Sequence, residues 1–100
     1  MALQITIDEA LEVARHEIAR VISESDRLSK YTFGEVVFLR ENDRVWTFAA
    51  GSEDLIEQGY VPGAVIVSVD KEDGHVWTRE ETEQYSLERE RMKRGAQAVV

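Results

Sequence analysis

The sequence contains no cysteine, a single proline and no long apolar run. Without cysteine the chain has no disulfide framework, no thiolate nucleophile and no cysteine-ligated metal. Its apolar runs are far shorter than the ~20 residues of a membrane span, so we expect no contact with membranes. The N-terminus lacks the basic and apolar segments of a signal peptide. These absences lead us to expect a cytoplasmic protein.

Positive charge is also scarce, because twelve Lys and Arg face twenty Asp and Glu, for a net charge of −8. This field would repel a polyphosphate, so we expect no nucleic-acid partner, whereas a basic protein would be attracted. Residues 41–57 hold a net charge of −4, and Tyr60 follows in a glycine-flanked loop of the kind that can anchor an interface. A solvated surface that keeps the protein soluble is the alternative interpretation. The candidate partner-binding residues are Glu41, Asp43, Glu53, Asp54, Glu57 and Tyr60.

The chain is long enough for one domain, and 43% of its 100 residues are hydrophobic. We expect a single domain over residues 1–94 and a flexible tail over residues 95–100. The domain begins with a helix, because Thr6 and Glu9 have the spacing of a capping box. An apolar stripe with helical period follows and ends near residues 23–26. The stripe consists of Ile7, Ala10, Leu11, Ala14, Ile18, Val21 and Ile22.

Four apolar segments separated by turn residues predict strands. They span residues 34–40, 44–49, 64–69 and 75–78. Asp73-Gly74 predicts a two-residue turn before the fourth strand, and residues 51–59 predict a loop with one helical turn capped by Ser52. A second capping box at Thr78 and Glu81 predicts a charged helix to about Arg94. The predicted fold is α+β: a helix packed on a four-stranded antiparallel meander, followed by a charged helix, in a cystatin-like arrangement.

The first three predicted strands are apolar on both sides, unlike a sheet with one face in water. Val36 and Phe38 face one way, while Val37 and Leu39 face the other. One amphipathic helix covers one sheet face. We therefore expect the second face to be covered by the C-terminal helix, by a second copy of the chain or by a partner.

No grouping of residues indicates catalysis, a metal or a cofactor. His16 lies on the helix side opposite the apolar stripe, and His75 follows the predicted turn. Two separated histidines are too few for a zinc site. Asp70, Glu72 and Asp73 cluster at an exposed hairpin tip, whereas paired catalytic carboxylates need a cleft. We therefore predict that the protein is not an enzyme and has no cofactor.

Three segments are similar to a family of bacterial immunity proteins, the YrhB-type domain, also called immunity protein 35. They are the N-terminal helix rich in Glu and Ala, the strand pair of residues 34–39 with Trp46, and residues 62–76, in which a proline precedes an apolar strand and an Asp-x-x-Asp-Gly turn. Glu35 stands where the family tends to have an aromatic residue. The resemblance covers most of residues 6–86 and implies neutralisation of a cognate toxin by direct binding, with no catalytic residue.

Our leading hypothesis is therefore a non-enzymatic protein-binding module, namely an immunity or inhibitor protein whose partner is a basic toxin. The alternative is a small-molecule-binding or enzymatic domain on a curved sheet, with a cavity between helix and sheet. A third hypothesis is a structural homodimer in which the bare sheet faces pair.

Overall fold

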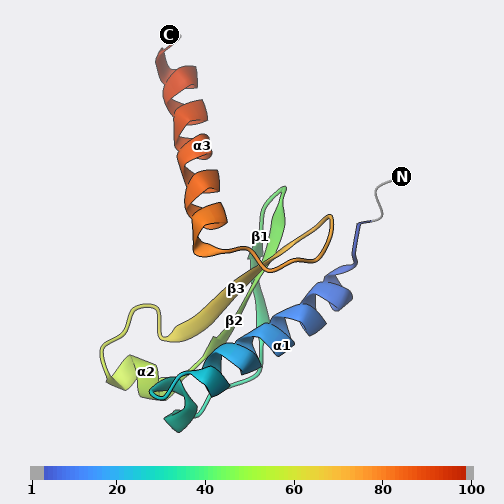
Figure 1. The fold of residues 1–100 in the computed structure, drawn as a ribbon. Coiled ribbons are helices and arrows are strands. Elements are labelled where there is room, and N and C mark those ends of the chain that lie inside the picture. The colour runs from blue at the N-terminus through green and yellow to red at the C-terminus, as the bar shows by residue number, and fades with distance from the viewer. Residues whose placement is uncertain (1–3, 99–100) are drawn as a thin grey trace.

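The computed structural model describes residues 4–98, with side chains described for residues 4–92. Along the chain, one long helix precedes a small sheet and a second long helix follows it (Figure 1). In chain order the elements are α1 (Ile7–Glu24), the 3-10 turn η1 (Leu28–Lys30), β1 (Val37–Glu41), β2 (Val45–Gly51), α2 (Glu53–Glu57), β3 (Ala64–Asp70) and α3 (Arg79–Ala98). The predicted α+β class, N-terminal helix, antiparallel sheet and C-terminal helix are confirmed.

The sheet has three strands in the order β1-β2-β3, so the prediction of a fourth strand is wrong. Residues 75–78 form a single bridge between Val76 and Val69. The predicted two-residue turn is a longer loop, residues 71–74, closed by a 2.9 Å hydrogen bond from Asp70 N–H to the His75 carbonyl. Thr78 then caps α3. The chain leaves the sheet there because the helix begins before a strand can extend.

Helix α1 begins and packs as its sequence predicts. The Thr6 hydroxyl accepts from Glu9 N–H at 3.1 Å, and a Glu9 carboxylate oxygen accepts from Thr6 N–H at 3.0 Å. Ala10, Ala14 and Ile18 are buried against one face of the sheet. The small alanines let the helix lie close to the strands, so this contact forms the core. The sheet residues of this core are Phe48, Ala50, Val67 and Val69.

Cross-strand pairing places alternate rows of side chains on the two faces of the sheet. Phe48 pairs with Phe38 and with Val67 in a row that faces α1. The next row, Val37–Ala49–Ile66, therefore faces the opposite way. A bulge between Phe38 and Arg40 shifts the register in β1.

Helix α3 begins with the predicted second capping box, in which Glu81 N–H donates to the Thr78 hydroxyl at 3.1 Å and Thr78 N–H donates to the Glu81 carboxylate at 3.0 Å. The helix continues to Ala98, beyond the predicted end at Arg94. The last two residues of the predicted tail, 99 and 100, lie outside the described residues. Figure 1 shows α1 lying along the sheet and α3 projecting away from it.

Candidate functional site

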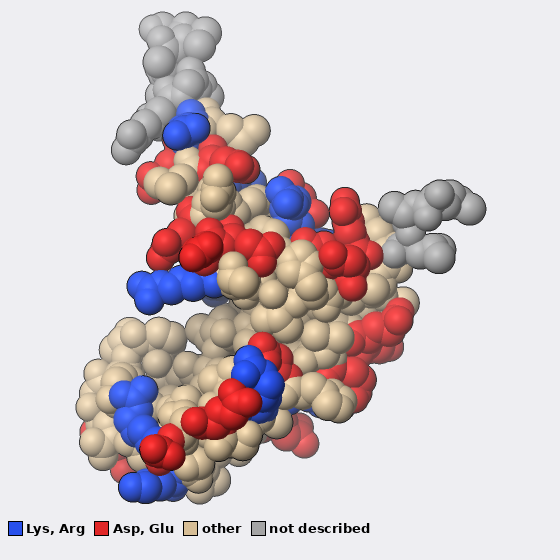
Figure 2. Space-filling model, in the orientation of Figure 1, with Lys and Arg blue, Asp and Glu red and all other residues tan. Residues whose placement is uncertain are grey.

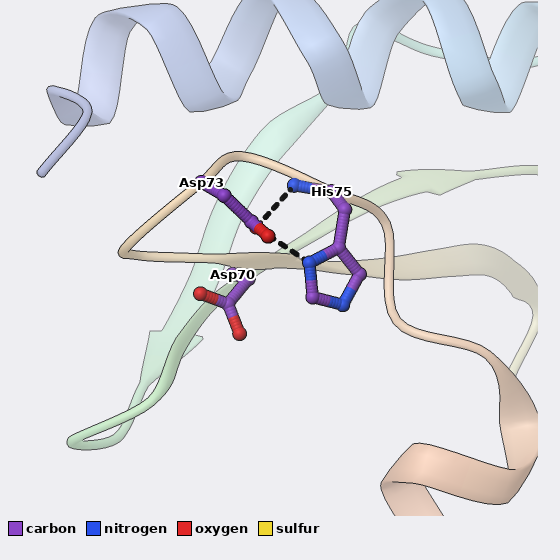
Figure 3. A group of neighbouring side chains, drawn as sticks. All are labelled: Asp70, Asp73 and His75. Carbon is purple, nitrogen blue, oxygen red and sulfur yellow. Dashed lines mark hydrogen bonds and ion pairs between the residues drawn. The ribbon is translucent and has the colours of Figure 1, made fainter.

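The loop between β3 and α3 gathers the histidine and carboxylates that the sequence places around the predicted turn (Figure 3). Among the described residues, Asp70, Asp73 and His75 bring their potential ligand atoms within 4.8 Å of one another. Asp73 Oδ1 accepts from His75 N–H at 3.0 Å and also contacts His75 Nδ1. On the other side of the ring, His75 Nε2 lies 2.8 Å from Glu81 Oε2 of α3. The imidazole therefore bridges the loop and the first turn of α3.

Asp70 is the buried member of this group, with 8% of its surface exposed. One carboxylate oxygen accepts from Glu72 N–H at 2.8 Å, and the other accepts from Trp77 Nε1–H at 2.9 Å. Burial by itself would raise the pKa of Asp70, but these two hydrogen bonds outweigh it and hold the pKa below its ordinary value. Asp70 is therefore an ionised acceptor that fixes the indole of Trp77.

His75 is stabilised in its charged form. Its contact with Glu81, and then its contact with Asp73, raise the pKa of the imidazole. In return the pKa of Asp73 is lowered, first by the His75 N–H and then by the ring. The pKa of Glu81 is lowered first by the Thr78 N–H and then by His75. A protonated imidazole has no lone pair, so in this state it can neither accept a proton nor ligate a metal.

The contacts of the loop point to a structural clamp. Both oxygens of Asp70 accept hydrogen bonds from the loop, and a cation that used His75 as a ligand would have to displace the ion pairs of its ring with Asp73 and Glu81. The other histidine, His16, is exposed on α1, where Nδ1 lies 2.8 Å from the Glu12 carbonyl. We therefore interpret Asp70, Asp73 and His75 as a structural clamp that holds the start of α3 against the sheet.

A second set of contacts joins the start of α3 to the β1–β2 hairpin. The Tyr85 hydroxyl donates to Asp43 Oδ1 at 2.6 Å, which lowers the pKa of Asp43 and raises that of Tyr85. The rings of Tyr85 and Trp77 meet edge to face, 5.6 Å between centroids, and the Arg44 guanidinium lies 5.6 Å from the Trp77 ring centre. Among described side chains, residues 86–92 make no hydrogen bond or ion pair to another element. The anchoring of α3 is thus concentrated in its first two turns.

The six predicted partner-binding residues lie at two opposite ends of the sheet. Glu41 and Asp43 flank the β1–β2 turn, whereas the other four lie on α2 or just after it. Strand β2 has seven residues, which separates the two groups by about 23 Å. Residues 41–57 therefore do not form one acidic surface. The four residues at the α2 end are Glu53, Asp54, Glu57 and Tyr60.

Most of these six side chains hold the fold together. Glu41 pairs with Lys71 Nζ at 2.6 Å, and Asp43 holds Tyr85. At the other end, Asp54 Oδ2 accepts from Thr32 N–H at 2.8 Å. The Tyr60 hydroxyl contacts Arg27, whose guanidinium also lies 4.7 Å from the centre of the tyrosine ring. Two acids are exposed with no such contact among the described residues. They are Glu53 and Glu57.

The most exposed apolar side chains of the sheet were not among the predicted site residues. All five residues of β1 are exposed, and Val37 retains 53% of its accessible surface. Across the sheet Ile66 remains 37% exposed. Because Val37, Ala49 and Ile66 form one row on the face opposite α1, we call them the apolar row. The doubly apolar strand pattern was the signal that could have identified them.

Comparisons of the chain with protein families, with curated proteins and with solved structures find no match. The resemblance to immunity proteins therefore stays a prediction. Within residues 4–98, no helix combines the length and the apolar character that crossing a membrane requires.

Proposed function

We propose that this chain is a protein-binding module without catalytic activity, and that its partner is a basic protein. The apolar row of Val37, Ala49 and Ile66 carries the proposal, because its outer members Val37 and Ile66 are exposed on the sheet face opposite α1. An apolar row of this kind beside an unpaired edge strand is a surface on which another protein can dock. Its central member, Ala49, is small and buried, so the exposed apolar surface of the row comes from Val37 and Ile66.

The charge around the apolar row supports a basic partner. The exposed acids Glu53 and Glu57 lie on α2, which begins directly after β2 at the end of the sheet nearest to Ala49. The chain as a whole carries a charge of −8, so its field attracts a basic protein over a distance. Acids beside an apolar contact increase the association rate and orient the partner, while the apolar contact provides most of the affinity.

Inhibition of a bacterial toxin is the form of this function that the family resemblance implies. Such an inhibitor acts by covering a surface of its target and needs no chemistry of its own. The clamp at His75 is compatible with this role, because its polar atoms are already engaged within the chain. A catalytic or small-molecule role would call for an enclosed pocket lined by available polar groups. The groove at the start of α3 is open rather than enclosed, and its lining is Trp77 and Tyr85 together with the polar side chains Arg44, Thr78, Glu80, Glu81, Gln84 and Glu88.

The experiment is a calorimetric titration of the chain with the protein encoded beside it. Val37→Glu should weaken binding at least about tenfold, because it buries a charge in the contact. Glu53→Lys combined with Glu57→Lys should weaken binding less than Val37→Glu does and should reduce the dependence of the affinity on salt. Leu87→Glu is the matched control, since it places the same charge at an exposed apolar position on α3. Absence of binding, or equal losses for Val37→Glu and Leu87→Glu, would contradict the proposal.

A further inference from the structure

The charges of α3 are separated along its length. Residues 79–88 contain four acids and one base, whereas residues 89–94 contain four bases and one acid. The two halves cancel, so the surplus negative charge of the chain lies outside this helix. Helix α3 is therefore an electrically neutral part of an acidic molecule, and it carries opposite signs at its two ends.

One exposed face of α3 carries both signs around an apolar centre. Leu87 is 60% exposed, and Glu83 and Arg91 lie one turn before and one turn after it on the same side of the helix. A groove of about 350 Å³ runs along this face. It is lined by Thr82, Glu83, Ser86, Leu87 and Glu90. Figure 2 shows that α3 stands out from the body of the molecule with charged side chains of both signs.

We propose that α3 binds α3 of a second copy in an antiparallel pair, with the two-fold axis at Leu87. In this register Leu87 meets its counterpart, and Glu83 of each copy lies beside Arg91 of the other. The contact is isologous, because the same face of the same helix supplies both sides. The pair thus closes as a dimer.

The charge pattern selects a second copy and its direction. Antiparallel packing sets the acidic first half of each helix against the basic second half of the other, whereas parallel packing would place like charges together. The rest of the molecule disfavours self-association. The net charge of −8 lies outside α3, so these acidic parts of two copies repel one another. The neutral α3 projects from that body and can meet its counterpart at a distance from it.

This inference does not depend on the proposed function, although the two surfaces adjoin: Glu83 and Thr82 of α3 line one groove with Ile66 of the apolar row. A single leucine on each side and surface ion pairs make a weak dimer. Sedimentation equilibrium should therefore extend to about 1 mM protein. Across that range the average mass should rise from one chain toward two. A monomer at every concentration would overturn the proposal.

Two substitutions at exposed apolar positions of α3 test whether the helix pairs through the face that carries Leu87. Leu87→Glu should raise the dimer dissociation constant at least about tenfold. Met92→Glu is the control, since Met92 is 72% exposed but lies about 140° around the helix from Leu87. Equal effects of the two substitutions would contradict the proposed face.

A charge exchange tests whether the ion pairs form between copies. Glu83→Arg and Arg91→Glu should each weaken the dimer, because each puts like charges together across the axis. The double variant should restore association, since opposite charges would then face one another again across the axis with their positions exchanged. Circular dichroism checks that helicity is kept. A double variant that associates no better than the single variants would exclude this register.

The absence of cysteine allows the direction to be measured with one spin label. With Glu80→Cys labelled, the antiparallel register predicts labels about 20–25 Å apart, because residue 80 lies seven residues from the axis. A parallel pair in the same register would bring them to about 10 Å. The short distance would overturn the antiparallel arrangement.

Discussion

Helices α1 and α3 start in the same way but have different roles in the molecule. Each has a threonine cap and a glutamate three residues later, and the two helices have 18 and 20 residues. In α1, Ala10, Ala14 and Ile18 are buried on the sheet. In α3, Leu87 and Met92 stay 60% and 72% exposed. A capping box therefore determines where a helix begins, while the spacing of its apolar residues determines whether it joins the core.

The comparison also separates two kinds of attachment. Helix α1 is held by apolar contact along its length, whereas α3 is fastened at one end by polar and aromatic contacts around His75, Trp77 and Tyr85. A helix fastened at one end adds little to the stability of the domain. It instead presents a face to something outside the domain.

The largest predicted effect is the loss of unfolding free energy when a core side chain under α1 is shortened. Ile18→Ala should lower the free energy of unfolding by about 2–4 kcal/mol, because Ile18 is 2% exposed and its removal leaves a cavity under α1. Leu87→Ala should change it by less than about 0.5 kcal/mol in dilute protein. Urea unfolding of both variants measures the difference. Similar losses would show that α3 belongs to the core.

A smaller effect is expected where α3 is fastened. Trp77→Phe keeps a ring beside Tyr85 but removes the hydrogen bond to the buried Asp70, which should cost about 1–3 kcal/mol. The pKa of Asp70 should rise at the same time, since one of the bonds that lowers it is lost. Urea unfolding and NMR titration of the carboxyl group measure the two changes. Tyr85→Phe, which removes an exposed bond to Asp43, is the control and should cost less.

The two capping boxes should respond differently to the same substitution. Thr6→Ala should lower the free energy of unfolding of the whole domain by about 1 kcal/mol, because α1 forms with the core. Thr78→Ala removes an equivalent cap, but its effect should appear as faster amide exchange in α3, with less than about 0.5 kcal/mol of global change. Hydrogen exchange beside urea unfolding distinguishes the two. Equal global losses would contradict the difference between the helices.

The smallest predicted effect is a pH dependence of the fastening at His75. The pKa of His75 in the folded chain is raised above its ordinary 6.5. The stability that the charged imidazole contributes is therefore fully present below pH 6.5 and is lost as pH rises through the folded pKa. The facing carboxylates of Asp70, Asp73 and Glu81 have lowered pKa values and stay ionised over this range. Trp77 fluorescence between pH 6 and 9 should therefore report a loosening toward higher pH. His75→Gln should remove this change, and a tightening with rising pH would contradict the assignment.

The sequence was informative where a short pattern determines the structure. The capping boxes at Thr6 and Thr78, and the apolar stripe of α1, identified both helices correctly. The predicted fourth strand failed because Asp73-Gly74 indicates a change of direction but does not determine how many residues the loop contains. The loop closes between Asp70 and His75, and Thr78 starts a helix before the ladder extends.

The candidate site was harder to predict, because it depends on distances in space. Residues 41–57 are close in sequence, yet strand β2 between them carries Glu41 and Glu53 to opposite ends of the sheet. The bond between Tyr85 and Asp43 joins positions 42 residues apart, and it depends on the direction in which α3 leaves the sheet. No local pattern encodes that direction. The doubly apolar strands did predict a second apolar face that α1 does not cover, and the apolar row lies on the face opposite α1.

Amide hydrogen exchange of α1 and α3, measured at low and high protein concentration, tests most directly whether α3 pairs with α3 of a second copy. We expect α1 amides at Ala14 and Ile18 to exchange at the same rate at both concentrations, because the core protects them within one chain. Amides of α3 around Leu87 should exchange rapidly in dilute protein and slow down as the concentration rises. Protection of α3 that does not change with concentration would contradict the account.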